Sequence, residues 1–404
     1  MLGDLVLLLS IDRWSETASF ETWFPSGTGD DEPEQAGLAD VAFQVLRSHP
    51  EDPTLEALES LGARASAALD VDHTRISTLF SSEGDALRRI AQIDAARVAR
   101  LRSADDFRAA RRRARGLILR LRGRSVRAKL EESLLGNLFG GPTGSYGLPL
   151  LARQGSIPTL RLDAIEPELT KRYSPHNAVI VVCGDVDRLA TLTAIRDAFG
   201  PLLRDAPIPA KEVNIDVKRR PPRANVSVEV KLPTDGDYLL IGWGLPPSSQ
   251  ASHEAFEAAA GYLATKHLTA AFTEDTRSLS VWTSRFRHAG AFEVMVSLEP
   301  TATATVTASK VHAAIGAGDI DGDVLEAVKV DLLARAHRSL DSPSRRAATL
   351  ALAEIRGAGP DSVAARLRSL AALSTKMVSE AMSTYLANRK HVMVVGRGRE
   401  EPTP

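Results

Sequence analysis

Apolar residues recur along the chain with two different periods, and each period predicts a different kind of element. Short apolar runs rich in β-branched residues predict strands, at 4–11, 18–24, 179–183, 226–230, 238–242, 281–286, 292–298 and 392–395. Apolar residues spaced three to four positions apart predict amphipathic helices, at 38–47, 82–93, 105–138, 252–273, 302–317, 322–340 and 375–386. Strands and helices intermix without strict alternation. We therefore predict an α+β fold, with mainly antiparallel sheets and helices packed on one face.

One short pattern occurs twice, at 173–184 and 385–396. Each copy has a Tyr, a turn, a β-branched run and a closing Gly, with the same Tyr-to-Gly spacing. This repeat predicts two homologous domains, at 1–205 and 222–404. The segment between them, 206–221, is rich in proline and charge, which predicts an exposed linker.

Composition narrows the possible functions only slightly. The 404 residues include 50 basic and 51 acidic side chains, so the net charge of −1 gives no indication of nucleic-acid binding. A single cysteine, Cys183, excludes an internal disulfide and a cysteine-based zinc site. No apolar run approaches the ~18 residues that a membrane span needs.

The stretch from Phe24 to Leu46 carries the most specific pattern. A predicted strand is followed by Gly27-Thr28-Gly29-Asp30-Asp31-Glu32, and then by Gly37-Leu38-Ala39 at the start of a predicted helix. This order resembles the insulinase/pitrilysin zinc peptidases, the family that includes mitochondrial processing peptidase. Residues 173–185 are similar to the family's Tyr-x-Pro-x-Asn-Ala-Val-Leu-Val-Val-x-Gly-Asp, and 145–149 to its His-Pro-Tyr-Gly-x-Pro. The resemblance covers nearly the whole chain and implies two homologous α+β domains joined by a linker.

Active members of that family carry the inverted zinc motif His-x-x-Glu-His on this helix. The same positions here hold Asp40-Val41-Ala42-Phe43-Gln44, so both imidazole ligands and the carboxylate that activates water are absent. The family's third ligand is a Glu on a later helix, and counting back from Glu132 reaches Ala114 within an arginine-rich run. The resemblance thus implies a non-catalytic member, with degenerate positions at Asp40, Phe43, Gln44 and Ala114.

Other candidate chemistry has a simpler structural interpretation. Asp70-Val71-Asp72-His73 is the one compact polar cluster, and a strand edge or turn explains it. Asp185 and Asp187 follow a predicted strand, so one or the other is expected to cap the next helix, with a catalytic role as the alternative. No two of the nine histidines lie three or four residues apart. The arginine-rich run at 108–127 is interpreted as a solvated helix face, with an acidic protein surface or nucleic acid as the alternatives.

Zinc-free members of this family often work beside a zinc-bearing homologue. In some bacterial pairs the zinc-free chain supplies an Arg and a Tyr, in an Arg-Gly-Leu-x-Tyr pattern, that hold the substrate backbone. The matching stretch here begins at Arg277 and has Val281 at the Tyr position. Arg277 is therefore the candidate substrate-binding residue, and an ordinary salt-bridging surface Arg is the alternative.

The resemblance implies a non-catalytic subunit of a two-chain metallopeptidase, inactive alone, that pairs with a zinc-bearing homologue and helps to enclose peptide substrate. Zinc is expected in the partner and no cofactor in this chain. The alternative function is a structural scaffold with the peptidase fold and no role in proteolysis. Residues 1–9 are apolar but lack a basic n-region. A cytoplasmic location is therefore expected, or a periplasmic one if a signal peptide is removed before residue 1.

Overall fold

The computed structural model describes residues 5–47, 53–122, 125–140, 145–147, 150–206, 224–247, 252–267, 276–387 and 389–399. The predicted linker at 206–221 lies outside these residues, apart from Ala206. None of the helices in the described part of the chain is long and apolar enough to cross a membrane.

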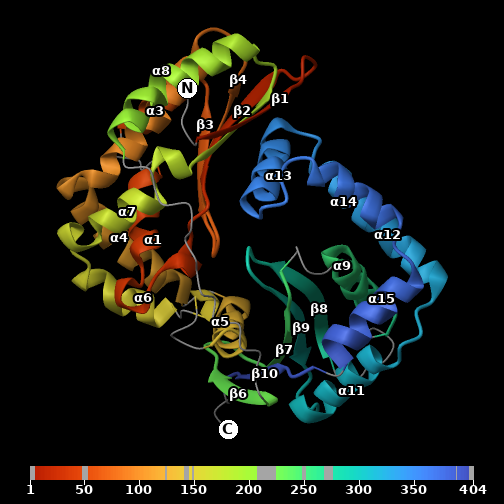
Figure 1. The fold of residues 1–404 in the computed structure, drawn as a ribbon. Helices are drawn as coiled ribbons and strands as arrows, with labels where there is room; N and C mark the ends of the chain where they lie inside the picture. The colour runs from red at the N-terminus through yellow and green to blue at the C-terminus, as the bar shows by residue number, and fades with distance from the viewer. Residues whose placement is uncertain are drawn as a thin grey trace. The chain divides into compact units, whose positions relative to one another are not determined.

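Two five-stranded sheets form the framework, and both have the same strand order (Figure 1). Sheet A runs β1 (Val6–Ile11), β5 (Val179–Gly184), β2 (Thr17–Phe24), β4 (Thr74–Ser81) and β3 (Arg64–Leu69). Sheet B runs β6 (Val226–Lys231), β10 (Val392–Arg397), β7 (Tyr238–Leu245), β9 (Gly290–Leu298) and β8 (Thr276–Arg285). In each sheet the first two strands are parallel and the other neighbours antiparallel. β5 and β10 hold equivalent places, which confirms the α+β class and the duplication predicted from the repeat.

β5 is the strand of the first repeat copy, and both of its faces are covered. All six of its residues are buried, so it reads as a continuous apolar run rather than an alternating one. Gly184 ends the strand with a φ of 124°, where a Cβ would lie 2.4 Å from the Thr17 carbonyl oxygen. Only glycine fits this position.

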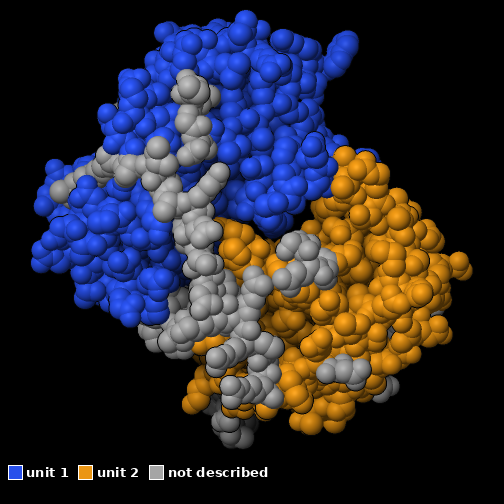
Figure 2. Space-filling view, viewed as in Figure 1, with its two compact units in different colours: residues 1–119, 151–215, 337–363 blue, residues 120–150, 216–336, 364–404 orange. Residues whose placement is uncertain are grey.

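The chain folds into two compact units, coloured separately in Figure 2. Unit 1 comprises residues 1–119, 151–215 and 337–363, and unit 2 comprises 120–150, 216–336 and 364–404. The helices of unit 1 are α1 (Leu38–Leu46), α2 (Pro53–Glu59), α3 (Ala86–Ala99), α4 (Ala104–Arg122), α6 (Leu150–Ser156), α7 (Leu162–Arg172), α8 (Arg188–Asp205) and α13 (Pro343–Ile355). The helices of unit 2 are α5 (Val126–Leu138), α9 (His253–Tyr262), α11 (Ala304–Gly316), α12 (Gly322–Arg338), α14 (Ser362–Ala371) and α15 (Thr375–Met382).

Each unit contains one helix from the other half of the sequence. Along the chain α5 lies between α4 and α6 of unit 1, yet it packs on β6, β7 and β10 of unit 2. α13 lies between α12 and α14 of unit 2, yet it packs on β1, β2 and β5 of unit 1. The two helices therefore cover equivalent strands of the two sheets. The compact units are not continuous in sequence, and the boundaries at 1–205 and 222–404 stay a prediction about the repeat.

These two helices cover the sheet face opposite the main helical layer. In sheet A, Trp23 packs in one cluster with Ala347 and Ala351 of α13, whereas the neighbouring Thr22 bonds Asp94 of α3. In sheet B, a Cβ on Gly242 would lie 2.6 Å from a methyl of Leu134 on α5. The main layers match the predicted one-sided packing, and α5 and α13 add cover on the second face.

Several predicted elements differ from the observed ones. The helix predicted at 105–138 is two helices, because Ser125 caps α5 by accepting a hydrogen bond from the Ala128 N–H. The helix predicted at 252–273 is α9 followed by a π-helical turn at Leu263–His267, and residues 268–273 lie outside the described part. The prediction did not include β3, β4 or α13.

Candidate functional site

Asp31 fixes the start of α1, the helix that carries the degenerate zinc motif. Its carboxylate accepts hydrogen bonds from the backbone N–H groups of Gly37 at 2.8 Å and Ala39 at 3.2 Å. A carboxylate at a helix N-terminus satisfies unpaired donors and opposes the helix dipole. Arg172 of α7 donates to the same carboxylate at 3.0 Å. Burial raises the pKa of Asp31 to about 7, against the opposing effect of Arg172.

Asp40 stands where the family has its first histidine, and it holds a guanidinium. Arg153 of α6 donates two hydrogen bonds to the Asp40 carboxylate, at 2.8 and 2.6 Å. Both side chains are largely buried, with exposed fractions of 12% for Arg153 and 4% for Asp40. A bidentate pair of this kind occupies the carboxylate lone pairs that a metal would need and places a positive charge beside them.

The other degenerate positions carry no ligand chemistry either. Phe43 is buried under the Arg47 guanidinium, which lies 5.6 Å from the ring centroid. Arg113 of α4 bonds the Gln44 carbonyl oxygen at 3.4 Å, which brings α4 alongside α1, and the neighbouring Ala114 is fully buried. The structure thus brings the helices of all four degenerate positions together. Within the described residues, no group of three or more His, Cys, Asp or Glu side chains could hold a metal ion.

The remaining polar motifs of unit 1 take part in local structure. Asp70 and His73 close the turn between β3 and β4 through a backbone hydrogen bond of 2.9 Å. The His73 ring packs on Trp23 with centroids 4.8 Å apart, and burial lowers the pKa of His73. Asp187 caps α8 by accepting a hydrogen bond from the Ala190 N–H at 2.8 Å. In the arginine-rich run, Arg111 donates to the Leu160 carbonyl oxygen.

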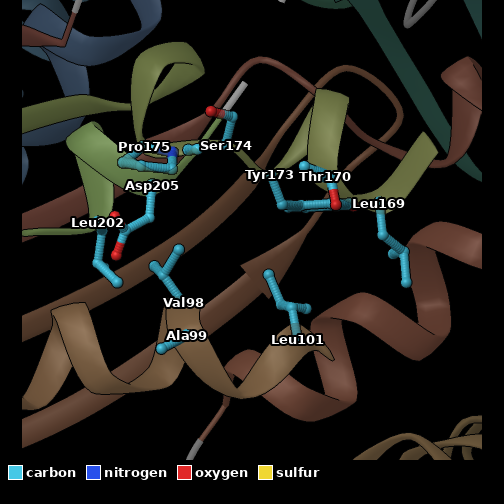
Figure 3. A pocket seen from close by; sticks show the side chains of 11 residues that line it. Val98, Ala99, Leu101, Leu169, Thr170, Tyr173, Ser174, Pro175, Leu202 and Asp205 are labelled. Carbon is cyan, nitrogen blue, oxygen red and sulfur yellow. The ribbon is translucent and has the colours of Figure 1, made fainter. Parts of the chain in front are cut away.

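A small pocket in unit 1 lies between the ends of α3, α7 and α8 (Figure 3). Its volume is about 120 Å³, and Val98, Leu101, Leu169 and Leu202 contribute apolar lining beside Asp205. None of the residues proposed from the sequence as site residues lines it. The pocket offers apolar surface, one carboxylate and the hydroxyl-bearing residues Thr170, Tyr173 and Ser174, and this set does not define a reaction.

Arg277, the candidate substrate-binding residue, lines a cavity of about 950 Å³ in unit 2. Its guanidinium Nε lies 3.3 Å from a carboxylate oxygen of Glu299, and the side chain is 54% exposed. The cavity is bordered by further charged residues from the ends of β6 and β10, namely Glu229, Lys231, Arg397 and Arg399. Arg397 is paired with Glu229 at 3.2 Å. Val281, at the family's Tyr position, packs instead on the hydrophobic core of unit 2.

No sequence pattern identified Arg153, which pairs with Asp40 at a former ligand position, or Arg172, which pairs with Asp31 just before the same helix. They lie 113 and 141 positions from the carboxylates that they bind. Each is the one arginine of its helix, in a chain with many arginines, so spacing alone could not pair it with its acid. Only a search for cations able to neutralise the acids of 31–40 would have found them.

The comparisons with known proteins agree with this geometry. Residues 169–315 match the family described as the peptidase M16 inactive domain. A protease from Helicobacter pylori is similar over 98% of this chain and 97% of its own, with a TM-score of 0.80 and 14% identity. A peptidase M16 inactive domain from Pseudomonas fluorescens is similar over 99% and 97%, with a TM-score of 0.81 and 17% identity. A chain of Complex III2 from Candida albicans is similar over 97% and 93%, with a TM-score of 0.80 and 16% identity. No curated protein matches the chain.

The family match and the absence of the zinc motif together indicate one class of protein. Residues 169–315 match the M16 peptidase inactive domain, and the positions of the zinc motif carry no zinc ligand, which supports a non-catalytic M16-type chain. The resemblance predicted from the sequence is confirmed at that level.

The purified chain should bind no stoichiometric zinc, because Asp40 is paired with Arg153 and Ala114 offers no ligand. Elemental analysis after dialysis measures this directly. Restoring the motif alone, with Asp40→His, Phe43→Glu and Gln44→His together, should still leave the chain without tightly bound zinc. Adding Ala114→Glu supplies a third ligand and is the matched variant in which affinity should rise. One tightly held zinc per wild-type chain would contradict the prediction.

Proposed function

We propose that this chain is the non-catalytic subunit of a two-chain zinc peptidase, paired with a zinc-bearing homologue and helping to enclose and bind peptide substrate. The observation that carries the proposal is the contrast between the two units. In unit 1 the position of the first zinc ligand holds Asp40 in a buried ion pair with Arg153, and Arg172 forms a second buried pair with Asp31 just before the same helix. In unit 2 Arg277 stays half exposed at the border of a large cavity.

The chemistry of Arg277 suits a peptide. A guanidinium presents several donors in a planar fork, which can bind a peptide carbonyl or a C-terminal carboxylate. Its pair with Glu299 is exposed, and exposed ion pairs contribute little stability. Substrate can therefore compete for Arg277 at small cost. The proposal places the pair in the cytoplasm, or in the periplasm if a signal peptide precedes residue 1.

Arg277→Ala should lower the peptidase activity of the assembled pair about tenfold to hundredfold, the equivalent of one charge-assisted hydrogen bond of ~1.5–3 kcal/mol. Arg335→Ala is the matched control, because Arg335 is an exposed, ion-paired arginine of the same unit outside the cavity. The measurement is kcat/KM on a peptide, with assembly checked by gel filtration. Equal activities of the wild-type and Arg277→Ala pairs would remove Arg277 from the site.

A second candidate function is a structural scaffold without a role in proteolysis. The likeness to a chain of Complex III2 favours it, because that neighbour belongs to a respiratory assembly. The two functions differ in one observable. A subunit of a peptidase changes the activity of its zinc-bearing partner when Arg277 is replaced, whereas a scaffold does not.

A further inference from the structure

Among the edge strands in the described part of the chain, β1 is the one that carries no charged residue. Four strands stand at the edges of the two sheets: β1 and β3 in sheet A, and β6 and β8 in sheet B. β3 carries Arg64, β6 carries Glu229 and Lys231, and β8 carries Arg277 and Arg285. β1 reads Val-Leu-Leu-Leu-Ser-Ile, without charge, proline or glycine. Charged side chains normally stop edge strands from pairing with another chain, and β1 lacks that protection.

The hydrogen bonding of β1 shows which of its groups face outward. The Val6 N–H donates to the Ala178 carbonyl at 3.1 Å, and the Asp12 N–H donates to the Gly184 carbonyl at 2.9 Å. In a parallel pair alternate residues bond the same neighbour, so the even-numbered residues of β1 bond β5. Leu7, Leu9 and Ile11 therefore direct their backbone N–H and C=O groups toward the outer edge. No strand within the described residues pairs with that edge.

Apolar surface continues past the end of the strand. Ile11 is 41% exposed and Trp14 is 97% exposed. The loop that carries Trp14 is held in one conformation by the Asp12 carboxylate, which accepts from the Trp14 N–H at 3.2 Å and from Arg346 at 3.0 Å. Figure 1 shows the connection between β1 and β2 projecting beyond the sheet. Tryptophan is enriched at interface hot spots, and here its backbone is bonded within the loop.

Two charged residues of the loop after β1 are paired within the chain, and a third, Glu16, is exposed. Arg13 pairs with Asp185 at 2.9 Å, and Arg346 pairs with Asp12 at 3.0 Å. In an antiparallel pair of β1 strands the loops of the two copies lie at opposite ends of the contact, so their like charges do not meet. The strand is also complementary to itself. Antiparallel pairing about a two-fold axis at Leu8 places Leu7 opposite Leu9 and Leu8 opposite its own counterpart.

We propose that β1 and Trp14 form a self-association surface, through which two copies of this chain pair their β1 strands antiparallel and join their A sheets edge to edge. The occupant of the edge is a second copy, because β1 is apolar at five of its six positions, carries no charge and is complementary to itself in antiparallel register. The proposal is independent of the pairing with a zinc-bearing homologue, since it concerns only sheet A.

Sedimentation equilibrium of the full chain over a range of concentrations tests this surface. The wild-type chain should form a dimer. Leu9→Pro removes an outward N–H and no bond to β5 and should abolish the dimer, since proline is tolerated at a sheet edge whose N–H faces outward. Ile11→Lys adds the charge that the other edge strands carry and should raise the dissociation constant at least tenfold, as should Trp14→Ala.

Leu189→Lys is the matched control for Ile11→Lys, because Leu189 is 74% exposed on α8 and lies outside the strand edge. It should leave the dissociation constant unchanged. Far-UV circular dichroism and thermal melting verify that each variant is folded. A wild-type chain that stays monomeric at all concentrations overturns the proposal. So does a dimer that the folded Ile11→Lys and Leu9→Pro variants retain with unchanged affinity.

Discussion

Replacing Arg172 with Met should destabilise the folded protein by about 3–5 kcal/mol at pH 8, the range seen when one partner of a buried ion pair is removed. The Asp31 side chain is fully buried and Arg172 is 5% exposed, so neither charge can be solvated in the folded state. Met keeps most of the apolar stem of the arginine side chain. The loss of stability therefore reports the removal of the guanidinium charge. Chemical denaturation measures it as a change in the free energy of unfolding.

The same variant should depend on pH in a defined direction. The folded pKa of Asp31 is about 7, above the ordinary value of 3.8. The folded state therefore binds the proton more strongly, and the contribution of Asp31 to wild-type stability falls as pH rises from about 4 to 7. Without Arg172 the pKa rises further, so the loss continues to grow above pH 7. The difference between wild type and variant should be larger at pH 8 than at pH 5.5.

Two control variants distinguish the effect of the unpaired Asp31 charge from a general loss of packing. Adding Asp31→Asn to Arg172→Met removes the unpaired carboxylate and should recover part of the lost stability. Arg161→Met breaks the exposed pair with Asp163 and should have no measurable effect. An equal loss at pH 5.5 and pH 8 in Arg172→Met would show that the Asp31 charge is not the cause.

Replacing Leu134 with Ala should destabilise unit 2 by about 2–5 kcal/mol, the range for a fully buried leucine. Leu134 lies on α5 with no exposed surface, against the bare backbone of Gly242 in β7. The lost methyl groups leave a cavity that the rigid strand cannot fill. Denaturation gives the magnitude, and amide hydrogen exchange gives the location.

The location of the faster exchange tests the fold more directly than the size of the destabilisation does. The reason is that α5 belongs to the first half of the sequence but packs on the sheet of the second half. Exchange should accelerate in β7 and β10, which α5 covers. Leu119→Ala is the control, since Leu119 precedes α5 and is 49% exposed, and its effect should stay within about 0.5 kcal/mol. Faster exchange confined to sheet A would contradict the assignment of α5 to unit 2.

Local sequence signals located most of the strands correctly because each contains a short run of apolar or β-branched residues, whether the strand is central like β5 or at an edge like β1 and β6. The repeated Tyr-to-Gly pattern identified β5 and β10 as equivalent, since the turn and the β-branched run that follow are encoded by neighbouring residues. β3 escaped notice because its Arg-Ala-Ser-Ala-Ala-Leu sequence has little strand preference. Only its pairing with β4 makes it a strand.

The sequence by itself determined that the zinc ligands are absent, because a side chain that is missing from a motif needs no fold to be recognised. It also determined the duplication and the α+β class. Only the tertiary structure decided what replaces the metal, since Asp40 and Arg153 meet from helices far apart in the chain. The same holds for the placement of α5 and α13, each on the sheet of the other half. Apolar periodicity predicts that a helix buries one face. It does not predict which sheet that face packs on, because burial against any apolar sheet face contributes similar hydrophobic stabilisation.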